Sequence, residues 1–318
     1  MNINKNSKIF ITGHNGLVGS SICRLLKKKK YKNLVLVSKD KLNLLNKSKV
    51  LSFLKKNKPE LIICCAAKVG GILSNNKYPA DYLYQNLLME LNIIHSAYEI
   101  GIKKIIFLAS SCIYPKLSKQ PIKENYLLTG PLEKTNEGYA LAKIAGVRLC
   151  RAVFEEHNLE YFSLMPTNLY GPEDNYDLEA GHVPASLMRR FHEAKTANST
   201  EVVVWGTGLP RREIMHVDDL ASACWQLLGQ KVGGELINVG TGTDIEIREF
   251  ATLMADVVGF KGEIIFDPSK PDGTPRKLLD VTKIHSLGWR HKIELFDGLS
   301  RTYEWYTNAL SKGEVRGY

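Results

Sequence analysis

The junction between a strand-like run, residues 9–12, and a glycine-rich turn constrains the fold more than any other stretch of this chain. Gly13, Gly16 and Gly19 give the turn the spacing G-x-x-G-x-x-G, and a helical pattern of apolar residues follows it. Glycines allow a tight turn and close approach of a backbone, and the free N–H groups of a helix N-terminus bind a pyrophosphate. The junction therefore predicts a dinucleotide site after the first strand. A glycine turn without a ligand is the alternative.

Strand-like and helix-like segments alternate after this junction. Apolar runs typical of strands buried on both faces occur at 34–37, 61–66, 105–109, 162–165 and 236–239. The alternation predicts an α/β fold, a Rossmann-type doubly wound parallel sheet whose ligands lie at the carboxyl ends of the strands. We expect a nucleotide domain over residues 1–166, which also uses part of 212–240. A smaller, interwoven α/β domain over 167–318 would hold the substrate.

The second strand leads into Ser38 and Lys39, about 20 residues beyond the glycine turn. An acidic residue at this place would hold a ribose 2′-hydroxyl, whereas a hydroxyl and a cation suit a 2′-phosphate. Ser38 and Lys39 therefore favour NADP(H) over NAD as the cofactor. The alternative is that Lys39 is a solvated lysine at a strand end with no role in binding. Ala66 and Ala67 follow the third strand, and a cofactor can approach such small residues closely.

Tyr139 and Lys143 lie four residues apart on a predicted helix, so the phenol and the ammonium share one face. Because a fixed ammonium favours the ionised phenol, we expect a lowered pKa that lets Tyr139 donate a proton near neutrality. Ser110 follows a predicted strand, where its hydroxyl can hydrogen-bond a substrate carbonyl. A surface Tyr/Lys pair is the alternative. Asp218 and Asp219 precede an apolar run and are expected to cap a helix.

Composition limits the remaining classes of function. The net charge of +10 comes from dispersed lysines, and no stretch combines arginines with stacking aromatics, so we expect no nucleic-acid partner. No apolar run approaches the ~20 residues that span a bilayer, and no signal peptide precedes the first strand, so we expect no membrane contact and a cytoplasmic location. The cysteines form no C-x-x-C pair, which predicts neither a metal site nor disulfides. Those other than Cys112 are expected to be buried packing residues.

With the glycine turn, Ser110, Tyr139 and Lys143 in this order, the chain resembles the extended short-chain dehydrogenase/reductase family. The segments 13–20, 66–72, 110–115, 165–172 and 270–277 are similar to one branch of that family, and the similarity runs over essentially the whole chain. Members of that branch convert GDP-4-keto-6-deoxy-mannose to GDP-L-fucose. They epimerise C3 and C5 and then reduce the C4 ketone with NADPH. The resemblance implies the same bifunctional activity here.

The resemblance also implies roles in catalysis. C3 and C5 flank the ketone, and inversion needs a base on one face and an acid on the other; Cys112 would be the base and His182 the acid. Their reference pKa values, ~8.5 and ~6.5, lie close enough to neutrality for small shifts to make both usable. Ser110 and Tyr139 would hydrogen-bond the C4 oxygen, and Tyr139 would protonate the alkoxide. Lys143 would hold the nicotinamide ribose. A packing cysteine and a solvated histidine are the alternatives.

The implied binding residues form two groups. For NADP(H) they are Gly13, Asn15, Gly16, Leu17, Val18, Gly19, Ser38, Lys39, Ala66, Ala67, Lys143, Pro166, Asn168, Leu169 and His182. For the GDP-sugar they are Asn168, Arg190, Trp205, Arg212 and Asp272. Arginine suits the diphosphate, Trp205 could pack against sugar or base, and Asp272 could accept a hydrogen bond from a hydroxyl. A surface charge and a core aromatic are the alternatives for Arg190 and Trp205.

Two departures from the family pattern leave the substrate open. Gly138 stands where relatives carry proline, and residues 176–181 differ from the usual sequence before His182. Since that loop would close over the sugar, a GDP-4-keto-6-deoxy-heptose is the alternative substrate, for the same chemistry or for C4 reduction alone. An epimerase alone and a cofactor-binding protein without catalysis are further alternatives, and the complete Ser/Tyr/Lys set argues against the last. The resemblance also implies a homodimer, through helices 80–100 and 137–157.

Overall fold

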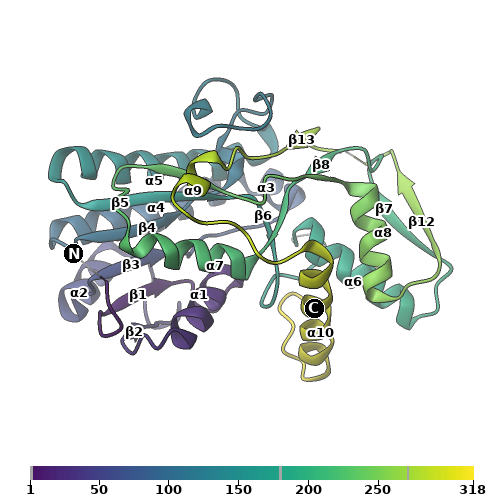
Figure 1. The fold of residues 1–318 in the computed structure, drawn as a ribbon, viewed down its shortest axis with the longest axis horizontal. Coiled ribbons are helices and arrows are strands. Elements are labelled where there is room, and N and C mark those ends of the chain that lie inside the picture. Colours follow the sequence, from purple (N-terminus) through teal and green to yellow (C-terminus); the bar gives the residue numbers. More distant parts are fainter. Residues whose placement is uncertain (1–2, 179–180, 271) are drawn as a thin grey trace.

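The computed structural model describes residues 3–178, 181–270 and 272–318. Figure 1 shows a larger region built on a parallel sheet and a smaller region beside it. The N-terminal end lies on the larger region, and the C-terminal end lies beside the last helix in the smaller one. Three residues of the predicted substrate loops, 179, 180 and 271, lie outside the described ranges.

A six-stranded sheet is the centre of the larger region. Its strands are β1 (Ile9–Thr12), β2 (Leu34–Val35), β3 (Leu61–Cys64), β4 (Lys104–Leu108), β5 (Glu160–Pro166) and β10 (Leu236–Val239), in the spatial order β10-β5-β4-β3-β1-β2. Every neighbouring pair is parallel. The chain turns back between β1 and β3, and ligands of doubly wound sheets bind where the strand order reverses. The predicted doubly wound α/β fold is confirmed.

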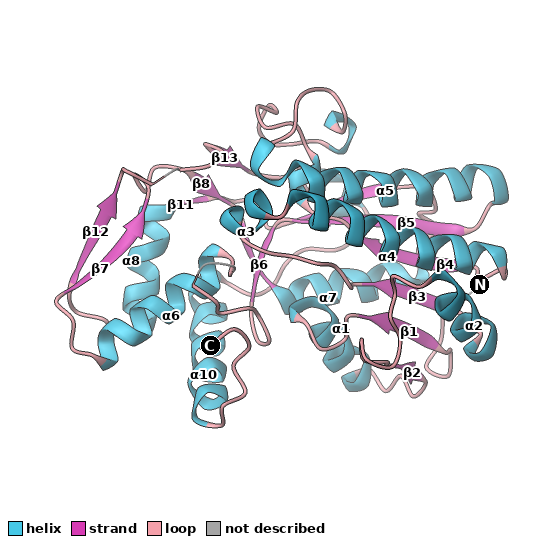
Figure 2. Cartoon of the chain, turned by 180° about the vertical axis from the view of Figure 1, so that it is seen from behind, coloured by secondary structure: helices cyan, strands magenta, loops and turns pink. Residues whose placement is uncertain are grey.

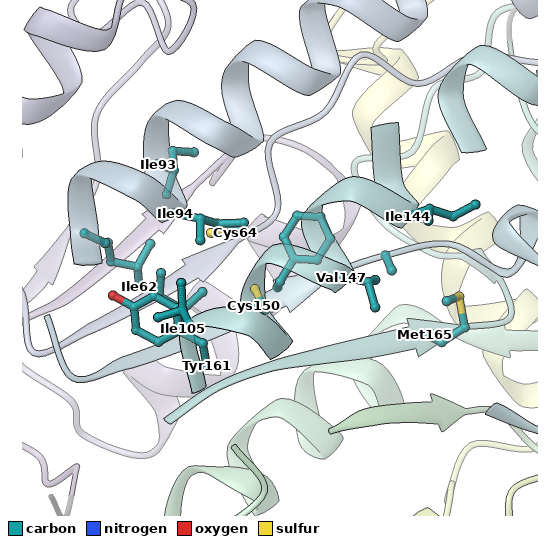
Figure 3. Close-up of a cluster of buried hydrophobic side chains, with 14 of the residues drawn as sticks. Ile62, Cys64, Ile93, Ile94, Ile105, Ile144, Val147, Cys150, Tyr161 and Met165 are labelled. Carbon is teal, nitrogen blue, oxygen red and sulfur yellow. The ribbon is translucent and has the colours of Figure 1, made fainter. Parts of the chain in front are cut away.

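Helices cover both faces of the sheet. Helices α1 (Leu17–Lys28) and α7 (Val217–Gln226) lie on one face, and α2 (Lys47–Asn57), α4 (Pro79–Glu99) and α5 (Glu137–His157) lie on the other (Figures 1 and 2). Because both faces are covered, every residue of β3 and β4 is buried. Figure 3 shows how the second face is filled by buried side chains from helices and strands, among them Ile94 of α4, Val147 of α5 and Ile105 of β4.

The smaller region has its own apolar core. Its main elements are α6 (Val183–Thr196), β7 (Glu201–Trp205), α8 (Ile247–Val258), β12 (Glu263–Asp267) and α10 (Leu295–Ser311). Short strands connect it to the larger region: β6 (Asn168–Tyr170) pairs with β9 (Ile214–His216), and β8 (Arg211–Arg212) lies between β11 (Ile245–Glu246) and β13 (Arg276–Lys277). The remaining helices are α3 (Ile72–Lys77), α9 (Thr282–Ser286) and four short 3₁₀ turns, η1 (Ser111–Ile113), η2 (Glu124–Tyr126), η3 (Lys134–Asn136) and η4 (Leu227–Gly229).

The predicted capping role of Asp218 and Asp219 is wrong. The N-cap of α7 is His216, whose Nδ1 accepts from the backbone N–H of Asp218 at 3.1 Å. Both aspartates lie in the first turn, where negative charge is favourable. Asp219 accepts from the backbone N–H groups of Lys292 and Ile293, so it fastens the segment before α10 to α7.

The cysteines are free thiols, and all are buried except Cys65, which is half-buried. Within the described ranges, no helix is long and apolar enough to cross a membrane.

Candidate functional site

The glycine turn adopts the conformation that a dinucleotide site needs. Gly13 has a φ of +64°, and a Cβ there would lie 2.9 Å from the backbone of Ala66. A Cβ at Gly19 would overlap the carbonyl of Gly13. Helix α1 begins after Gly16, which provides no side-chain cap, so the first N–H groups of the helix remain available to an anion. The turn therefore fits a pyrophosphate.

Thr12 fixes the crevice beside this turn. Its hydroxyl accepts from the backbone N–H groups of Cys65 and Ala66 at 3.1 and 3.0 Å, which ties the end of β1 to the loop after β3. Ala66 and Ala67 thus lie beside the glycine turn. The other predicted cofactor residues also follow strand ends. Ser38 and Lys39 come after β2, and Pro166 ends β5, with Asn168 and Leu169 on β6.

Two predicted cofactor side chains already have partners. The Ser38 hydroxyl lies beside the Asp40 carboxylate and helps to lower the pKa of that group, whereas Lys39 is exposed. The Asn168 amide donates to the carbonyl oxygen of Glu213 at 2.9 Å, which holds β6 beside β9. Asn15 is exposed, and Leu17 and Val18 form the first turn of α1.

Ser110 links two of the reactive side chains. It follows β4 and precedes the η1 turn, which carries the buried Cys112, while Tyr139 lies in the first turn of α5. The Ser110 hydroxyl lies near both the Tyr139 phenol and the Cys112 thiol, and it opposes the rise that burial causes in the pKa of each group. A carbonyl held by Ser110 would therefore contact an acid and a base together.

The expected lowering of the Tyr139 pKa is wrong. Burial raises the pKa of this phenol well above its usual value, and Lys143 opposes that effect without overcoming it. The Nζ atom of Lys143 lies 5.8 Å from the centre of the Tyr139 ring. Loss of solvent around the phenol outweighs one ammonium at this distance. Tyr139 consequently keeps its proton at neutral pH, as a proton donor should.

Lys143 is held by a residue that sequence reasoning missed. Its Nζ atom lies 2.8 Å from Oε1 of Glu90 on α4, and it donates to the carbonyl oxygen of Leu108 at 3.0 Å. The side chains of Lys143 and Glu90 are each 3% exposed. Glu90 holds the pKa of Lys143 above its usual value, even though burial acts against the charged ammonium. The only sequence signal was an acidic residue on the buried stripe of a long helix.

Lys277 is the second residue that sequence reasoning gave no role, and it faces both Cys112 and His182. Burial raises the pKa of Cys112, while Lys277, Ser110 and Lys143 oppose the increase. His182 is exposed at the start of α6, yet enough protein surrounds it that desolvation, aided by Lys277, lowers its pKa. The two pKa values therefore move apart instead of toward neutrality. Lys277 lies within segment 270–277, which carried the family resemblance, but only Asp272 of that segment was predicted to bind substrate.

The predicted substrate residues form a path that leads away from Cys112. Lys277 on β13 pairs in register with Arg212 on β8. Burial lowers the pKa of Arg212, and the nearby Asp272 carboxylate opposes that effect. Asp272 also accepts from the backbone N–H of Thr207 at 2.7 Å. These contacts place the Arg212 guanidinium beside Lys277 and the Asp272 carboxylate farther along the path, on Thr207.

Arg190 and Trp205 complete this path. The Arg190 guanidinium lies 4.9 Å from the centre of the Trp205 ring, and Lys270 approaches the same ring at 5.8 Å. Trp205 is 41% exposed, so it is not a core aromatic. An open indole beside two cations suits a nucleoside diphosphate, because the ring can stack while the cations bind phosphate.

The dinucleotide turn and the Ser/Tyr/Lys set at the same edge of the sheet define a short-chain type, dinucleotide-dependent oxidoreductase. Residues 9–240 match the family model described as the NAD dependent epimerase/dehydratase family, and the chain belongs to this family.

Three comparisons narrow the relationship. GDP-L-fucose synthase 1 of Arabidopsis thaliana is 55% identical over 302 residues, which are 95% of this chain and 94% of the relative. A crystal structure of a GDP-L-fucose synthetase from Naegleria fowleri bound to NADP superposes with a TM-score of 0.89, at 26% identity, over 99% of this chain and 98% of that one. A GDP-6-OMe-4-keto-L-xylo-heptose reductase from C. jejuni gives a TM-score of 0.90 at 35% identity, over 97% and 99%. The resemblance seen in the sequence is confirmed.

A substitution in the turn tests the dinucleotide site. We expect Gly19→Ala to raise the dissociation constant for NADPH by about 100-fold, because the added methyl overlaps the Gly13 carbonyl and displaces the N-terminus of α1. Calorimetric titration with NADPH measures this constant. Gly229→Ala is the control, since nothing lies within 4 Å of a Cβ at that position. Equal affinities for the two variants would contradict a binding role for the turn.

Proposed function

We propose that this protein is a bifunctional NADPH-dependent 3,5-epimerase and 4-reductase that converts GDP-4-keto-6-deoxy-D-mannose to GDP-L-fucose. The observation that carries the proposal is the convergence on Ser110: its hydroxyl lies near a candidate base, Cys112, and a candidate proton donor, Tyr139, and influences the pKa of both. The relatives named GDP-L-fucose synthase support the substrate. NADPH would supply the hydride that reduces C4.

In the epimerisation, Ser110 and Tyr139 hydrogen-bond the C4 oxygen, which acidifies the protons at C3 and C5 and stabilises the enolate that forms. At C3 and again at C5, Cys112 removes the proton as the base and His182 delivers a proton to the opposite face. Between the two inversions the thiol loses its proton to solvent and His182 regains one from solvent. In the reduction, Tyr139 gives its proton to the C4 oxygen as the alkoxide develops. Lys143 holds the ribose of the nicotinamide, and the glycine turn and Ser38 with Lys39 hold the phosphates.

The protonation states give this chemistry a specific pH dependence. Because burial raises the pKa of Cys112 and lowers that of His182, the resting pair is a thiol and a neutral imidazole. The form with a thiolate base and an imidazolium acid is then a minor one at neutral pH. Lys277 faces both groups, and its charge makes the thiolate easier to reach.

On the substrate side, Arg190 and Arg212 bind the diphosphate, Trp205 stacks on the base or sugar, and Asp272 accepts from a hydroxyl. Asn168 contributes from β6, with its amide nitrogen already committed to Glu213. We assign NADP(H) to residues 1–166 with part of 212–240, and the GDP-sugar mainly to 167–318. We place the reaction in the cytoplasm.

A GDP-4-keto-6-deoxy-heptose is the second candidate substrate, and the similarity to the heptose reductase of C. jejuni favours it. The loop before His182 would contact C6 of the sugar. The heptose carries a longer chain at this end, so its turnover tests whether the loop accepts the extra carbon. The chemistry at C3, C4 and C5 would be the same, or would be limited to C4.

One assay in deuterated water separates these functions. The protein is incubated with NADPH and either GDP-4-keto-6-deoxy-mannose or the heptose analogue, while absorbance loss and product NMR are followed. Oxidation of NADPH, together with deuterium incorporation and inversion at C3 and C5, supports the bifunctional enzyme. Turnover of the heptose analogue alone identifies the heptose as the substrate. Reduction without deuterium leaves a reductase only. If neither sugar gives NADPH oxidation or deuterium exchange, the assignment of the protein as this enzyme is contradicted.

We also propose a homodimer through α4 and α5. These helices pack side by side over the sheet, and their outer surface carries exposed apolar side chains, among them Tyr84, Leu91 and Leu141. Two copies related by a two-fold axis would bury this apolar surface in a bundle of four helices.

A charge placed on this surface tests the dimer. We expect Leu141→Lys to raise the dimer dissociation constant by about 100-fold, because an unpaired ammonium would have to be buried in the interface. Sedimentation analysis over a range of concentrations measures the change. Leu117→Lys is the control, because Leu117 is 82% exposed and lies outside both helices. A wild-type monomer, or a Leu141→Lys dimer as tight as the control, would contradict this interface.

A further inference from the structure

We propose that Glu90 is a positioning residue for Lys143: its buried carboxylate keeps the ammonium charged and aimed at Tyr139 and the nicotinamide ribose. The proposal rests on the proposed function, since it concerns the reduction step of the same site. It adds to the Ser/Tyr/Lys set a fourth member that lies on a different helix and does not contact the substrate.

The geometry of the pair is that of a built contact. Glu90 and Lys143 come from adjacent helices, α4 and α5, and meet at 2.8 Å with both side chains 3% exposed. In the described part of the chain, no hydrogen-bond donor other than Lys143 reaches either oxygen of Glu90. A buried carboxylate normally has several donors, so this one is directed to the lysine alone.

A purely stabilising role explains this arrangement poorly. Burying two charges costs as much solvation as their attraction returns, and apolar residues of similar volume often stabilise a fold equally well. The surrounding core is apolar, with Ile93 and Ile94 on the same helix, so an apolar residue could have filled this position. Keeping an acid here makes sense if the charge of Lys143 matters.

The other titratable groups around the pair do not replace Glu90. Those facing it are Tyr139 and Cys150 on α5, Cys64 at the end of β3, Cys65 just after β3, and Cys112 in η1. Burial raises the pKa of all these thiols and of the phenol, to about 12 for Cys64, so they are neutral at working pH. Glu90 is therefore the source of negative charge next to Lys143.

The consequence for pH follows from this. With Glu90 present, the pKa of Lys143 lies above its usual value, and the ammonium persists across the working range. Without it, desolvation is the main remaining influence, and desolvation lowers the pKa of a lysine. Lys143 would then lose its proton as pH rises, and the reduction would fail at a pH at which the wild-type protein is still active.

The experiment is the pH profile of C4 reduction for Glu90→Gln, an isosteric change that removes only the charge. We expect the rate to fall by about 10- to 100-fold at pH ~9, and much less at pH ~6.5, because a mispositioned and neutral Lys143 loses its contacts. Glu99→Gln is the control: it changes the same residue type on α4, where Glu99 pairs with His95 at the surface. Glu90→Asp, which keeps the charge, should recover part of the high-pH rate.

Lys143→Met tests whether Glu90 acts through the lysine. In that background we expect Glu90→Gln to cause no further loss of reduction, because the group it positions is gone. A full additional loss would overturn the proposal, as would a Glu90→Gln profile that superposes on the wild type. If Glu90→Gln does not fold, the same comparison is made with Glu90→Asp. Its shorter side chain should make the rate fall at a lower pH than in the wild type. A pH profile identical to that of the wild type would overturn the proposal.

A binding measurement separates this proposal from the proposed function. We expect Glu90→Gln to weaken NADPH binding by about 10-fold at pH ~9, since the hydrogen bond of a charged Lys143 to the ribose is lost. This titration needs no sugar. If the wild-type protein turned over neither GDP-sugar, the proposed function would fail while the coupling of Glu90 to Lys143 remained measurable. If the wild-type enzyme were active and Glu90→Gln bound NADPH with unchanged affinity, the positioning role of Glu90 would be rejected and the proposed function would stand.

Discussion

Cys112→Ala is expected to reduce deuterium incorporation at C3 and C5 by about 100- to 10,000-fold, the usual contribution of a general base. NADPH oxidation should continue, because Ser110, Tyr139 and Lys143 remain, and the reduced sugar should keep its original configuration at C3 and C5. Product NMR after reaction in deuterated water measures both results. A wild-type exchange rate that rises with pH on the acid side of its optimum fits the same role, since burial raises the pKa of the thiol and a larger fraction is ionised as pH increases.

Cys224→Ala is the matched control for this variant. Cys224 is also buried, but it lies on α7, on the opposite face of the sheet. Both variants lose a small buried side chain and should lose similar stability, so a difference between them reports on chemistry. If Cys112→Ala retained wild-type exchange, Cys112 would be a packing residue and His182 would have no partner base.

Tyr139→Phe is expected to slow NADPH oxidation by about 100- to 10,000-fold, because the C4 alkoxide loses its proton donor. The phenol is well suited to this task, since burial raises its pKa and keeps the proton in place until the alkoxide forms. Deuterium exchange should fall less than reduction does, because Ser110 still hydrogen-bonds the C4 oxygen. The rate of absorbance loss gives the first quantity and NMR gives the second.

The dissociation constant for NADPH must be measured on the same variant. It should remain near the wild-type value, since the Tyr139 hydroxyl is assigned to the sugar and Lys143 to the cofactor. Tyr98→Phe is the control; Tyr98 lies on α4 and stacks on His157 at 4.6 Å, away from Ser110. Equal reduction rates for Tyr139→Phe and Tyr98→Phe would contradict the role of Tyr139 as the acid.

Local pattern was sufficient to place the main elements around the candidate site. The glycine turn and the four-residue spacing of Tyr139 and Lys143 on one helix are short-range features that occur where they were predicted, whereas β2 and β3 end two residues before the predicted strand ends. Helix 137–157 has the bounds that were expected, and strand 236–239 joins the sheet beside β5. The cap of α7 was missed because a histidine, which is not a common capping residue, supplies the acceptor.

Electrostatic environment could not be predicted in the same way. The pKa of Tyr139 was expected to decrease because only Lys143 was visible nearby in the sequence, whereas the increase comes from atoms packed around the phenol. Cys112 and His182 were expected near neutrality for the same reason. Their pKa values move apart since burial favours the neutral form of each group.

The sequence by itself determined the fold class and predicted the dinucleotide turn and the Tyr139/Lys143 spacing, because these follow from periodicity and from spacings within one element. The family resemblance, and not a local pattern, implied Cys112 and His182. Only the tertiary structure decided which groups share a charge environment. Glu90 and Lys143 are separated by an intervening strand in the chain and meet through helix packing, and Lys277 reaches Cys112 and His182 from a strand near the C-terminal end. Desolvation and long-range ion pairs depend on distances between elements, and no local pattern encodes those distances.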